Sequence, residues 1–422
     1  MSDMETSSES NERLQWLTLV GLDESGWAGL SVAAREAVQA AELLVGGERH
    51  LAHVPVVAGQ QRLVWPSPIR HGIEAIADWS GRRVCVLASG DPFWFGIGAT
   101  LARHFPPQQM RTLPGPSAFS LAASRLGWSL QDVDCCSLVA RDPDRLRSRL
   151  APGRRLLVLS EDGGSPALVA RLLCEAGFGA SRLVVMESLG GPEERVSDGL
   201  ARDWGESSHG ALNTLALECR ADTPGGGMSR VPGRDEAAFS HDGQISKREI
   251  RAVVMALLAP RGGERLWDLG SGSGAVAVEW LLADAGNAAT VVDRREDRLA
   301  HARDNARCFG VGALECVAGE IATVLPELPA PDAIFIGGGA SGEGVLARCW
   351  QALPAGGRCV ASAVTTEGEA ALLAAHARYG GQLTRLSVDR TEPLGGFTGW
   401  RTLRPITLWS AVRPESEEKE RT

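Results

Sequence analysis

Several features that would assign a chain to a class at once are missing from this sequence. Its nine cysteines include no Cys-x-x-Cys pair, which argues against a cysteine-zinc site or a disulfide framework and predicts reduced thiols. No uninterrupted apolar run approaches the roughly 18 residues that span a bilayer. The N-terminal stretch is acidic and hydroxylated, where a secretory signal would be basic and then apolar. We therefore expect a cytoplasmic protein with no membrane partner.

Lysine is almost absent, and acidic residues outnumber basic ones. Lys247 and Lys419 are the only lysines among 43 basic residues, and 52 acidic residues give a net charge of −9. This balance argues against a nucleic-acid partner, because phosphate neutralisation needs a cationic surface. The one close histidine pair, His50 and His53, has a spacing more typical of a surface loop than of metal ligands, so no metal is predicted.

What the chain does have is length and an ordinary globular composition. Its 422 residues are 44% hydrophobic and 23% charged, which fits two or three domains with their own cores. A Gly- and Pro-rich stretch interrupts two α/β series and predicts a linker. We expect a disordered tail at 1–13, an α/β domain at 14–220, a linker at 221–235, an α/β domain at 236–412 and a charged tail at 413–422.

Short apolar runs bounded by turn residues predict the strands of both series. In the first series they lie at 17–20, 43–45, 84–87, 156–159, 183–185 and 215–217. In the second series they lie at 266–269, 290–293, 314–317, 333–336, 359–364, 383–388 and 406–409. Helical stretches between the early strands of the second series predict a parallel sheet with helices on both faces.

The second series opens with a helix signal. Ser246 and Glu249 have the spacing of a capping box, in which the hydroxyl and the carboxylate satisfy free N–H groups at a helix N-terminus. The apolar stripe of the helix follows at i, i+3, i+4, i+7 and i+8, and comprises Ile250, Val253, Val254, Leu257 and Leu258.

A glycine loop in the second domain points to a nucleoside cofactor. The strand that ends at Leu269 runs into Gly270-Ser271-Gly272-Ser273-Gly274 and then into a helical stretch, so that a ligand can approach the backbone closely at a helix N-terminus. Asp293 ends the next strand, 19 residues after Gly274, where a carboxylate can bind both hydroxyls of a ribose.

Residues alone leave the identity of this cofactor open. Gly270-x-Gly272-x-x-Ala275 also satisfies the loose dinucleotide pattern, so a nicotinamide-dependent oxidoreductase is an alternative. Asp268 before the first glycine, and the strict alternation of the three glycines, favour the S-adenosylmethionine enzymes of the seven-strand class. A tight turn without a ligand is the third interpretation.

Four segments of the second domain closely resemble the C-terminal half of the precorrin-6Y methyltransferases of cobalamin biosynthesis. These segments are Phe239–Arg251, the glycine loop, Asp332–Gly339 and Glu392–Trp400. The resemblance covers 235–412 and implies a Rossmann-like seven-strand methyltransferase that also removes a carboxyl group. Carried over by motif, the S-adenosylmethionine contacts would be Ser246, Gly270, Ser271, Gly272, Ser273, Gly274, Asp293, Gly319, Glu320 and Ile321.

The first domain resembles the tetrapyrrole methylase family, in its precorrin-6Y branch. The resembling segments are Leu19–Gly21, Ala41–His50, Val86–Gly96, Pro114–Ser120 and Arg125–Trp128. The resemblance implies two α/β subdomains with a cofactor trough between them. By motif, Ser89, Gly90, Asp91, Ser117 and Ala118 would contact the cofactor.

Two departures from the family pattern lie in this first domain. The loop Gly21–Gly26 has fewer glycines than the family's usual start, and Val139 stands where this branch commonly has a histidine. Valine can neither donate a hydrogen bond nor transfer a proton. The resemblance therefore leaves room for a tetrapyrrole-binding protein in which the first methyl-transfer site is silent.

As the resemblance implies, the first domain methylates C-5 and the second methylates C-15 of precorrin-6B. The second domain also decarboxylates the ring C (C-12) acetate, so that the product is precorrin-8X. The partner would be this anionic tetrapyrrole, and we expect a homo-oligomer. Cations that could bind substrate carboxylates are Lys247, Arg248, Arg390 and Arg401. The sequence identifies no catalytic residue.

Overall fold

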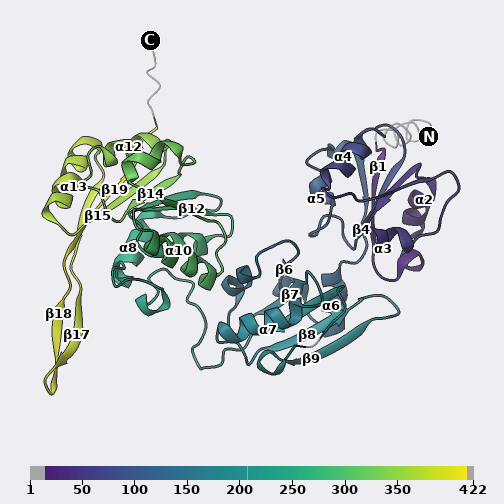
Figure 1. The fold of residues 1–422 in the computed structure, drawn as a ribbon, viewed down its shortest axis with the longest axis horizontal. Helices are drawn as coiled ribbons and strands as arrows, with labels where there is room; N and C mark the ends of the chain where they lie inside the picture. The colour runs from purple at the N-terminus through teal and green to yellow at the C-terminus, as the bar shows by residue number, and fades with distance from the viewer. Residues whose placement is uncertain (1–14, 207, 416–422) are drawn as a thin grey trace, which may run out of the picture. The chain divides into compact units, whose positions relative to one another are not determined.

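The computed structural model describes residues 15–206 and 208–415, and it divides the chain into two compact units (Figure 1). The chain passes from the first unit to the second between Gly227 and Met228, and residues 144–149 are grouped with the second unit. This passage falls inside the predicted linker, 221–235. The predicted tail at 1–13 and most of the one at 413–422 lie outside the described residues. Within the described part of the chain, no helix is both long and apolar enough to cross a membrane.

The first unit contains two five-stranded sheets. One is parallel, with the order β3-β2-β4-β1-β5. Its strands are β1 Leu17–Leu22, β2 Leu43–Gly46, β3 Gln61–Val64, β4 Val84–Ser89 and β5 Met110–Leu113. Its helices are α2 Val32–Ala40, α3 Glu48–Ala52, α4 Arg70–Ala77 and α5 Gly98–Leu101.

Alternate residues of these strands face opposite sides, as the two-residue period of a strand requires. Leu17 and Leu19 of β1 pack with α4 and α5, whereas Val20 and Leu22 pack with α2 and α3. Both faces of the sheet are thus buried, which explains why its strands are almost continuously apolar.

The second sheet of this unit is mixed, with the order β6-β7-β10-β8-β9. Only the β6–β7 pair is parallel. Its strands are β6 Asp134–Ser137, β7 Arg155–Leu159, β8 Arg182–Glu187, β9 Arg195–Leu200 and β10 Asn213–Glu218, and its helices are α6 Ala118–Leu126 and α7 Ser165–Glu175. The exposed residues of β9 explain why the apolar pattern did not reveal this edge strand.

The second unit is built on a seven-stranded sheet of order β13-β12-β11-β14-β15-β19-β16. The five strands that come first in the chain are parallel and β19 is antiparallel to both its neighbours, so the predicted parallel sheet is confirmed for the early strands. The strands are β11 Arg265–Leu269, β12 Ala288–Asp293, β13 Leu314–Ala318, β14 Ala333–Ile336, β15 Arg358–Ala363, β16 Gln382–Leu386 and β19 Ile406–Val412.

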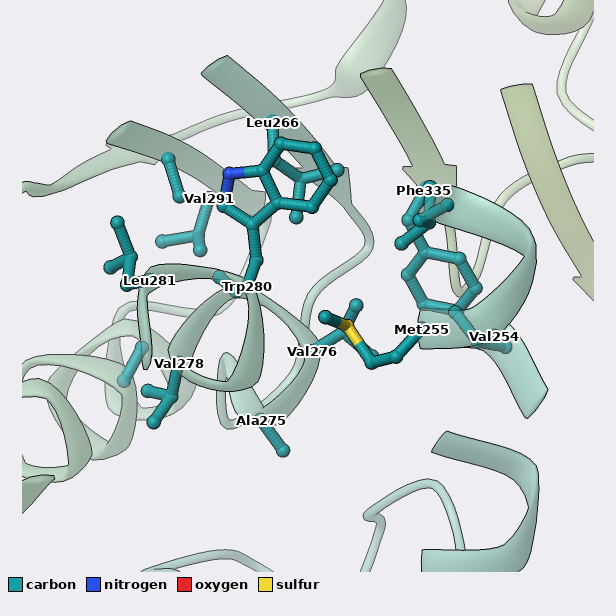
Figure 2. Packing of buried hydrophobic residues seen from close by; sticks show 14 of the residues in the cluster. Val254, Met255, Leu266, Ala275, Val276, Val278, Trp280, Leu281, Val291 and Phe335 are labelled. Carbon is teal, nitrogen blue, oxygen red and sulfur yellow. The ribbon is translucent and has the colours of Figure 1, made fainter. Parts of the chain in front are cut away.

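Helices cover both faces of this sheet. One face packs on α8, α9 and α10, and the other packs on α12 and α13. Figure 2 shows the first of these cores, where Trp280 of α9 and Met255 of α8 lie near Phe335 of β14. The helices are α8 Arg248–Leu258, α9 Ala275–Ala283, α10 Glu296–Phe309, α11 Ile321–Val324, α12 Val345–Ala352 and α13 Thr366–Tyr379.

The start of α8 differs from the prediction. The helix and its apolar stripe are present, but its N-cap is Lys247 without a side-chain cap, so the capping box is wrong. Glu249 instead accepts a hydrogen bond from Arg390 at 2.6 Å, and the carbonyl of Ser246 accepts one from Arg251. The ion pair with a distant arginine thus replaces the local cap.

A two-stranded hairpin, β17 Asp389–Leu394 and β18 Phe397–Thr402, extends away from the sheet of the second unit (Figure 1). The sequence predicts no strands here, because the residues of the hairpin are mostly exposed and do not alternate between apolar and polar. Arg390 joins the base of the hairpin to Glu236 at 2.9 Å and to Glu249.

Candidate functional sites in the two units

The glycine loop of the second unit adopts a conformation that needs glycine. Gly270, Gly272 and Gly274 have φ values of +65°, +56° and +68° between β11 and α9. A Cβ on Gly270 would lie 2.5 Å from the carbonyl oxygen of Gly338, which follows β14. The loop therefore exposes backbone at the carboxyl edge of the sheet, where α/β proteins bind their ligands.

A cavity of about 690 Å³ opens at this edge. Its lining includes five of the predicted cofactor residues, Ser246, Gly270, Ser271, Gly272 and Ser273. The other five are absent from the lining, and these are Gly274, Asp293, Gly319, Glu320 and Ile321.

Asp293 nevertheless contacts the loop directly. Its Oδ2 accepts a hydrogen bond from the amide of Gly272 at 3.0 Å, and its Oδ1 accepts one from the amide of Arg295 at 3.0 Å. The carbonyl of Asp293 accepts from the amide of Gly319 at 3.0 Å, which links the third predicted segment to the same place. Each carboxylate oxygen keeps a further lone pair for a ligand hydroxyl.

Two buried polar atoms beside the loop have no partner among the described residues. They are Oδ1 of Asp268 and Oγ of Ser271. Burial raises the pKa of Asp268 to about 7, although its Oδ2 accepts from the amide of Ala277 at 3.1 Å. Buried polar groups are normally hydrogen-bonded, so these two atoms fit a site that is completed by a polar ligand.

The predicted substrate cations divide into two pairs. Lys247 and Arg401 line the cavity, whereas Arg248 and Arg390 do not. Arg390 is already paired with two carboxylates, and exposed Arg248 lies 3.8 Å from Asp235.

The cavity also has a cation that was not predicted from the sequence, Arg404, just before β19. Within the described part of the chain, neither Lys247 nor Arg404 makes an ion pair. No sequence signal separates Arg404 from the many other arginines, because only the fold brings it to this edge.

A second cavity, of about 430 Å³, lies in the first unit at the carboxyl ends of β1 and β4. Its lining includes Ser89, Gly90, Ser117 and Ala118, but not Asp91. Gly90 has a φ of +55°, and a Cβ there would lie 2.7 Å from Cα of Ser117. The loops at Gly90 and Ser117 thus approach closely through their backbones, without a phosphate-type glycine fingerprint.

Two of the predicted residues here also have local structural roles. Ser117 caps α6, since its Oγ accepts from the amide of Ser120 at 3.1 Å. Oδ1 of Asp91 accepts from the amide of Phe93 at 2.8 Å and so holds the turn after Gly90. Val139, where this branch commonly has a histidine, lies in the cavity lining.

A polar cluster at this cavity includes three residues that were not predicted. These are Glu24, Arg49 and His50, which line the cavity together with the predicted Ser89. Nε2 of His50 lies 2.9 Å from Oγ of Ser89, and Nη2 of Arg49 lies 3.3 Å from the same Oγ. The surface-loop interpretation of His50 is therefore wrong, because α3 directs its ring toward the end of β4.

Among the described residues, no group of three or more His, Cys, Asp or Glu side chains is arranged to hold a metal ion.

Comparisons with known proteins match both units. Residues 17–204 match the model of the tetrapyrrole (corrin/porphyrin) methylases, and residues 237–413 match that of the precorrin methyltransferase domain. A precorrin-6Y C(5,15)-methyltransferase (decarboxylating) of Sinorhizobium sp. is 47% identical over 395 residues, which is 94% of this chain and 96% of that protein. The protein of that name from Mycobacterium tuberculosis is 40% identical over 400 residues, which is 94% of this chain and 100% of that protein.

Among solved structures, the C-terminal domain of precorrin-6Y C5,15-methyltransferase from Rhodobacter capsulatus is 47% identical. It covers 44% of this chain and 100% of its own, with a TM-score of 0.42. These relatives are named as methyltransferases, and the similarity extends over nearly their whole length. This rules against the nicotinamide oxidoreductase alternative. The chain belongs to the family of decarboxylating precorrin-6Y C(5,15)-methyltransferases, with a tetrapyrrole methylase domain followed by a precorrin methyltransferase domain.

Proposed function

We propose that the first unit methylates C-5 of a precorrin, and that the second unit methylates C-15 and removes the carboxyl group of the ring C (C-12) acetate. Membership of the family carries this proposal, because the chain aligns with decarboxylating C(5,15)-methyltransferases over 94% of its length. The substrate would be precorrin-6B and the product precorrin-8X. We also propose that the protein works in the cytoplasm as a homo-oligomer.

The methyl donor would be S-adenosylmethionine, bound once in each unit. In the second unit Asp293 would bind the ribose hydroxyls, while Ser246 and Gly270–Gly274 would surround the ligand. Gly319, Glu320 and Ile321 would complete that site. In the first unit the corresponding contacts would come from Ser89, Gly90, Asp91, Ser117 and Ala118. The unpartnered oxygens of Asp268 and Ser271 support a polar ligand at the second site.

A sulfonium methyl group is already electrophilic, so the protein has mainly to position an electron-rich ring carbon in line behind it. Decarboxylation needs an electron sink, and the conjugated macrocycle itself provides one. The chain would have to hold the acetate away from cations while it binds the other carboxylates.

The substrate carboxylates would be bound by Lys247, Arg401 and Arg404 at the second cavity. A tetrapyrrole with several carboxylates needs cations whose charge is not already neutralised. Lys247 and Arg404 meet this condition among the described residues, and exposed Arg401 lies 3.6 Å from Glu392. Arg248 and Arg390 are weaker candidates, because they lie outside the cavity lining and face carboxylates.

One experiment tests both assignments. The full-length protein is incubated with precorrin-6B and S-adenosylmethionine carrying a ¹³C-methyl group, and NMR locates the label while released carbon dioxide is measured. The wild type should carry label at C-5 and C-15. Gly90→Ala should lose the C-5 label alone, and Asp293→Ala should lose the C-15 label alone.

Label at C-15 only would show that the first site is silent, as Val139 allows. A doubly methylated product that keeps the ring C acetate would refute the decarboxylase assignment.

A further inference from the structure

The cavity of the first unit contains a hydroxyl–imidazole pair, formed by Ser89 and His50. Ser89 ends β4, and His50 lies in α3 immediately after β2, the strand that pairs with β4. Their side chains are 2.9 Å apart, from Oγ to Nε2, and both line the cavity. The pair therefore lies in the same cavity that would hold the methyl donor of this unit.

The neighbouring guanidinium determines which nitrogen of His50 carries the proton. Nη2 of Arg49 lies 3.1 Å from Nε2 of His50, and a guanidinium can only donate hydrogen bonds. Nε2 must therefore be the acceptor, which places the ring proton on Nδ1. Nδ1 is buried and has no partner among the described residues. The lone pair of Nε2, to which Arg49 donates, thus also lies beside the hydroxyl of Ser89.

The surroundings keep this imidazole neutral. Burial, followed by the charges of Arg49 and His53, lowers the pKa of His50 to about 4. Glu24 forms an ion pair with Arg49 and lies 3.8 Å from His53, and Asp23 lines the same cavity. Across the neutral pH range the ring can accept a proton and does not start out charged.

Methylation of a meso carbon requires such an acceptor. The ring supplies the electron pair of the new carbon–carbon bond, and the carbon–sulfur bond breaks with its pair left on sulfur. C-5 then carries both a hydrogen and the new methyl group, while the macrocycle holds a positive charge. Loss of that hydrogen as a proton returns its bonding pair to the ring and restores conjugation. A weak base is sufficient, because a C–H next to a cationic conjugated system is acidic.

We propose that the Ser89–His50 pair removes the C-5 proton in the first unit. The hydroxyl of Ser89 takes the proton from carbon as it gives its own proton to Nε2 of His50, and the imidazolium then releases a proton to solvent. Arg49 positions both partners. This inference rests on the proposed function of the first unit, and it explains how that unit can work although Val139 cannot take part in proton transfer.

The test uses the full-length protein, because methylation at C-15 by the second unit is then an internal reference in the same tube. His50→Gln keeps an acceptor for the Ser89 hydroxyl but cannot take up a proton, so label at C-5 should appear about 100-fold more slowly. Ser89→Ala should slow the same step. His104→Gln removes an exposed histidine of the same unit and should change neither rate.

Three readouts separate proton transfer from a structural role. Affinity for S-adenosylhomocysteine, measured by calorimetry, should be unchanged in His50→Gln. Added imidazole should restore C-5 methylation in His50→Ala. NMR of ¹⁵N-labelled histidine in the wild type should show His50 protonated on Nδ1 alone, and its C-5 rate should be flat between pH 6 and 8.

A wild-type C-5 rate in His50→Gln would overturn the inference. So would a loss of cofactor affinity that matches the loss of rate, because His50 would then act by binding. If the wild type itself never labels C-5, the proposed function of the first unit fails, and the inference fails with it.

Discussion

A buried ion pair in the second unit gives the sharpest stability prediction. Arg251 of α8 and Glu279 of α9 are both 0% exposed, with Nε of Arg251 3.2 Å from Oε1 of Glu279. Glu279 also accepts from the amides of Gly233 at 2.9 Å and Arg234 at 3.1 Å. Arg251 donates in turn to the carbonyls of Arg234 and Ser246. The pair therefore fixes both ends of the segment 233–247 that leads into the cavity.

Removing one charge of such a pair leaves the other charge buried and uncompensated, at a cost of about 3–5 kcal/mol. Glu279→Gln preserves shape and one acceptor oxygen, so the loss should come mainly from the charge. For a domain of 150–250 residues this corresponds to a fall of roughly 10 °C in the transition temperature. The double variant Arg251→Met with Glu279→Gln should recover part of the lost transition temperature, because no uncompensated charge remains.

Calorimetry of the full chain, in which the two units can unfold separately, measures this change. The matched control is Glu296→Gln, which breaks the exposed pair between Glu296 and Arg303, 2.6 Å apart. An exposed pair should contribute at most about 1 kcal/mol. Glu279→Gln no more destabilising than the control would refute the reasoning. A second consequence is weaker binding of S-adenosylhomocysteine, since the segment 233–247 includes Ser246 and Lys247 of the lining.

Three further predictions concern the same unit. Gly270→Ala should destabilise it by at least about 2 kcal/mol in urea unfolding, because a φ of +65° disfavours alanine and its Cβ would meet Gly338. Asp293→Ala should weaken S-adenosylhomocysteine binding about 10- to 100-fold in titration calorimetry, because hydrogen bonds to a charged group are lost. Burial would raise the pKa of Glu236, but hydrogen bonds from Arg390 and from backbone amides outweigh it and hold the pKa at about 2. A carboxyl group whose pKa is lowered by folding stabilises the folded state at pH values above its unfolded pKa, which is about 4.5 for Glu236. That stability should be lost as pH falls from there toward 2, and Arg390→Met should weaken this pH dependence, because only the backbone amides would still lower the pKa.

Each of these three predictions has an outcome that contradicts it. Gly356 also has a positive φ, of +76°, but a Cβ there meets nothing within 4 Å. Gly356→Ala should therefore lower the free energy of unfolding less than Gly270→Ala does. Equal losses would show that the close approach to Gly338 has no effect on stability. An unchanged affinity of Asp293→Ala for S-adenosylhomocysteine would contradict the proposed ribose contact. A dependence of stability on acid pH that is the same with and without Arg390 would contradict the explanation given for the lowered pKa of Glu236.

Local sequence patterns were sufficient to locate an element when the pattern depends on the residues of that element alone. The apolar runs located all the buried central strands, because a strand covered on both faces must be apolar along its length. The glycine loop could also be located from the sequence, since three alternating glycines between a strand and a helix predict a tight turn, and all three have a positive φ. Edge strands such as β9 and the exposed hairpin β17–β18 were missed, because their residues face solvent and need no apolar pattern.

The cap of α8 shows the opposite case. Ser246 and Glu249 have an ideal local spacing, yet Glu249 pairs with Arg390, about 140 positions along the chain. An ion pair with a distant arginine competes with the cap for the same carboxylate. Sequence spacing cannot show this competition, because Arg390 comes near only when the hairpin base folds back onto α8.

The sequence by itself determined the two α/β units, their central strands, the glycine loop and the family, since each of these depends on residues that are neighbours in the chain. Only the tertiary structure decided which polar side chains share a cavity. It brought Arg404 to the second site, directed Arg390 away to two carboxylates, and placed His50 against Ser89. Burial and partners set the charge and protonation of such groups, and both come from elements that are far apart in the chain.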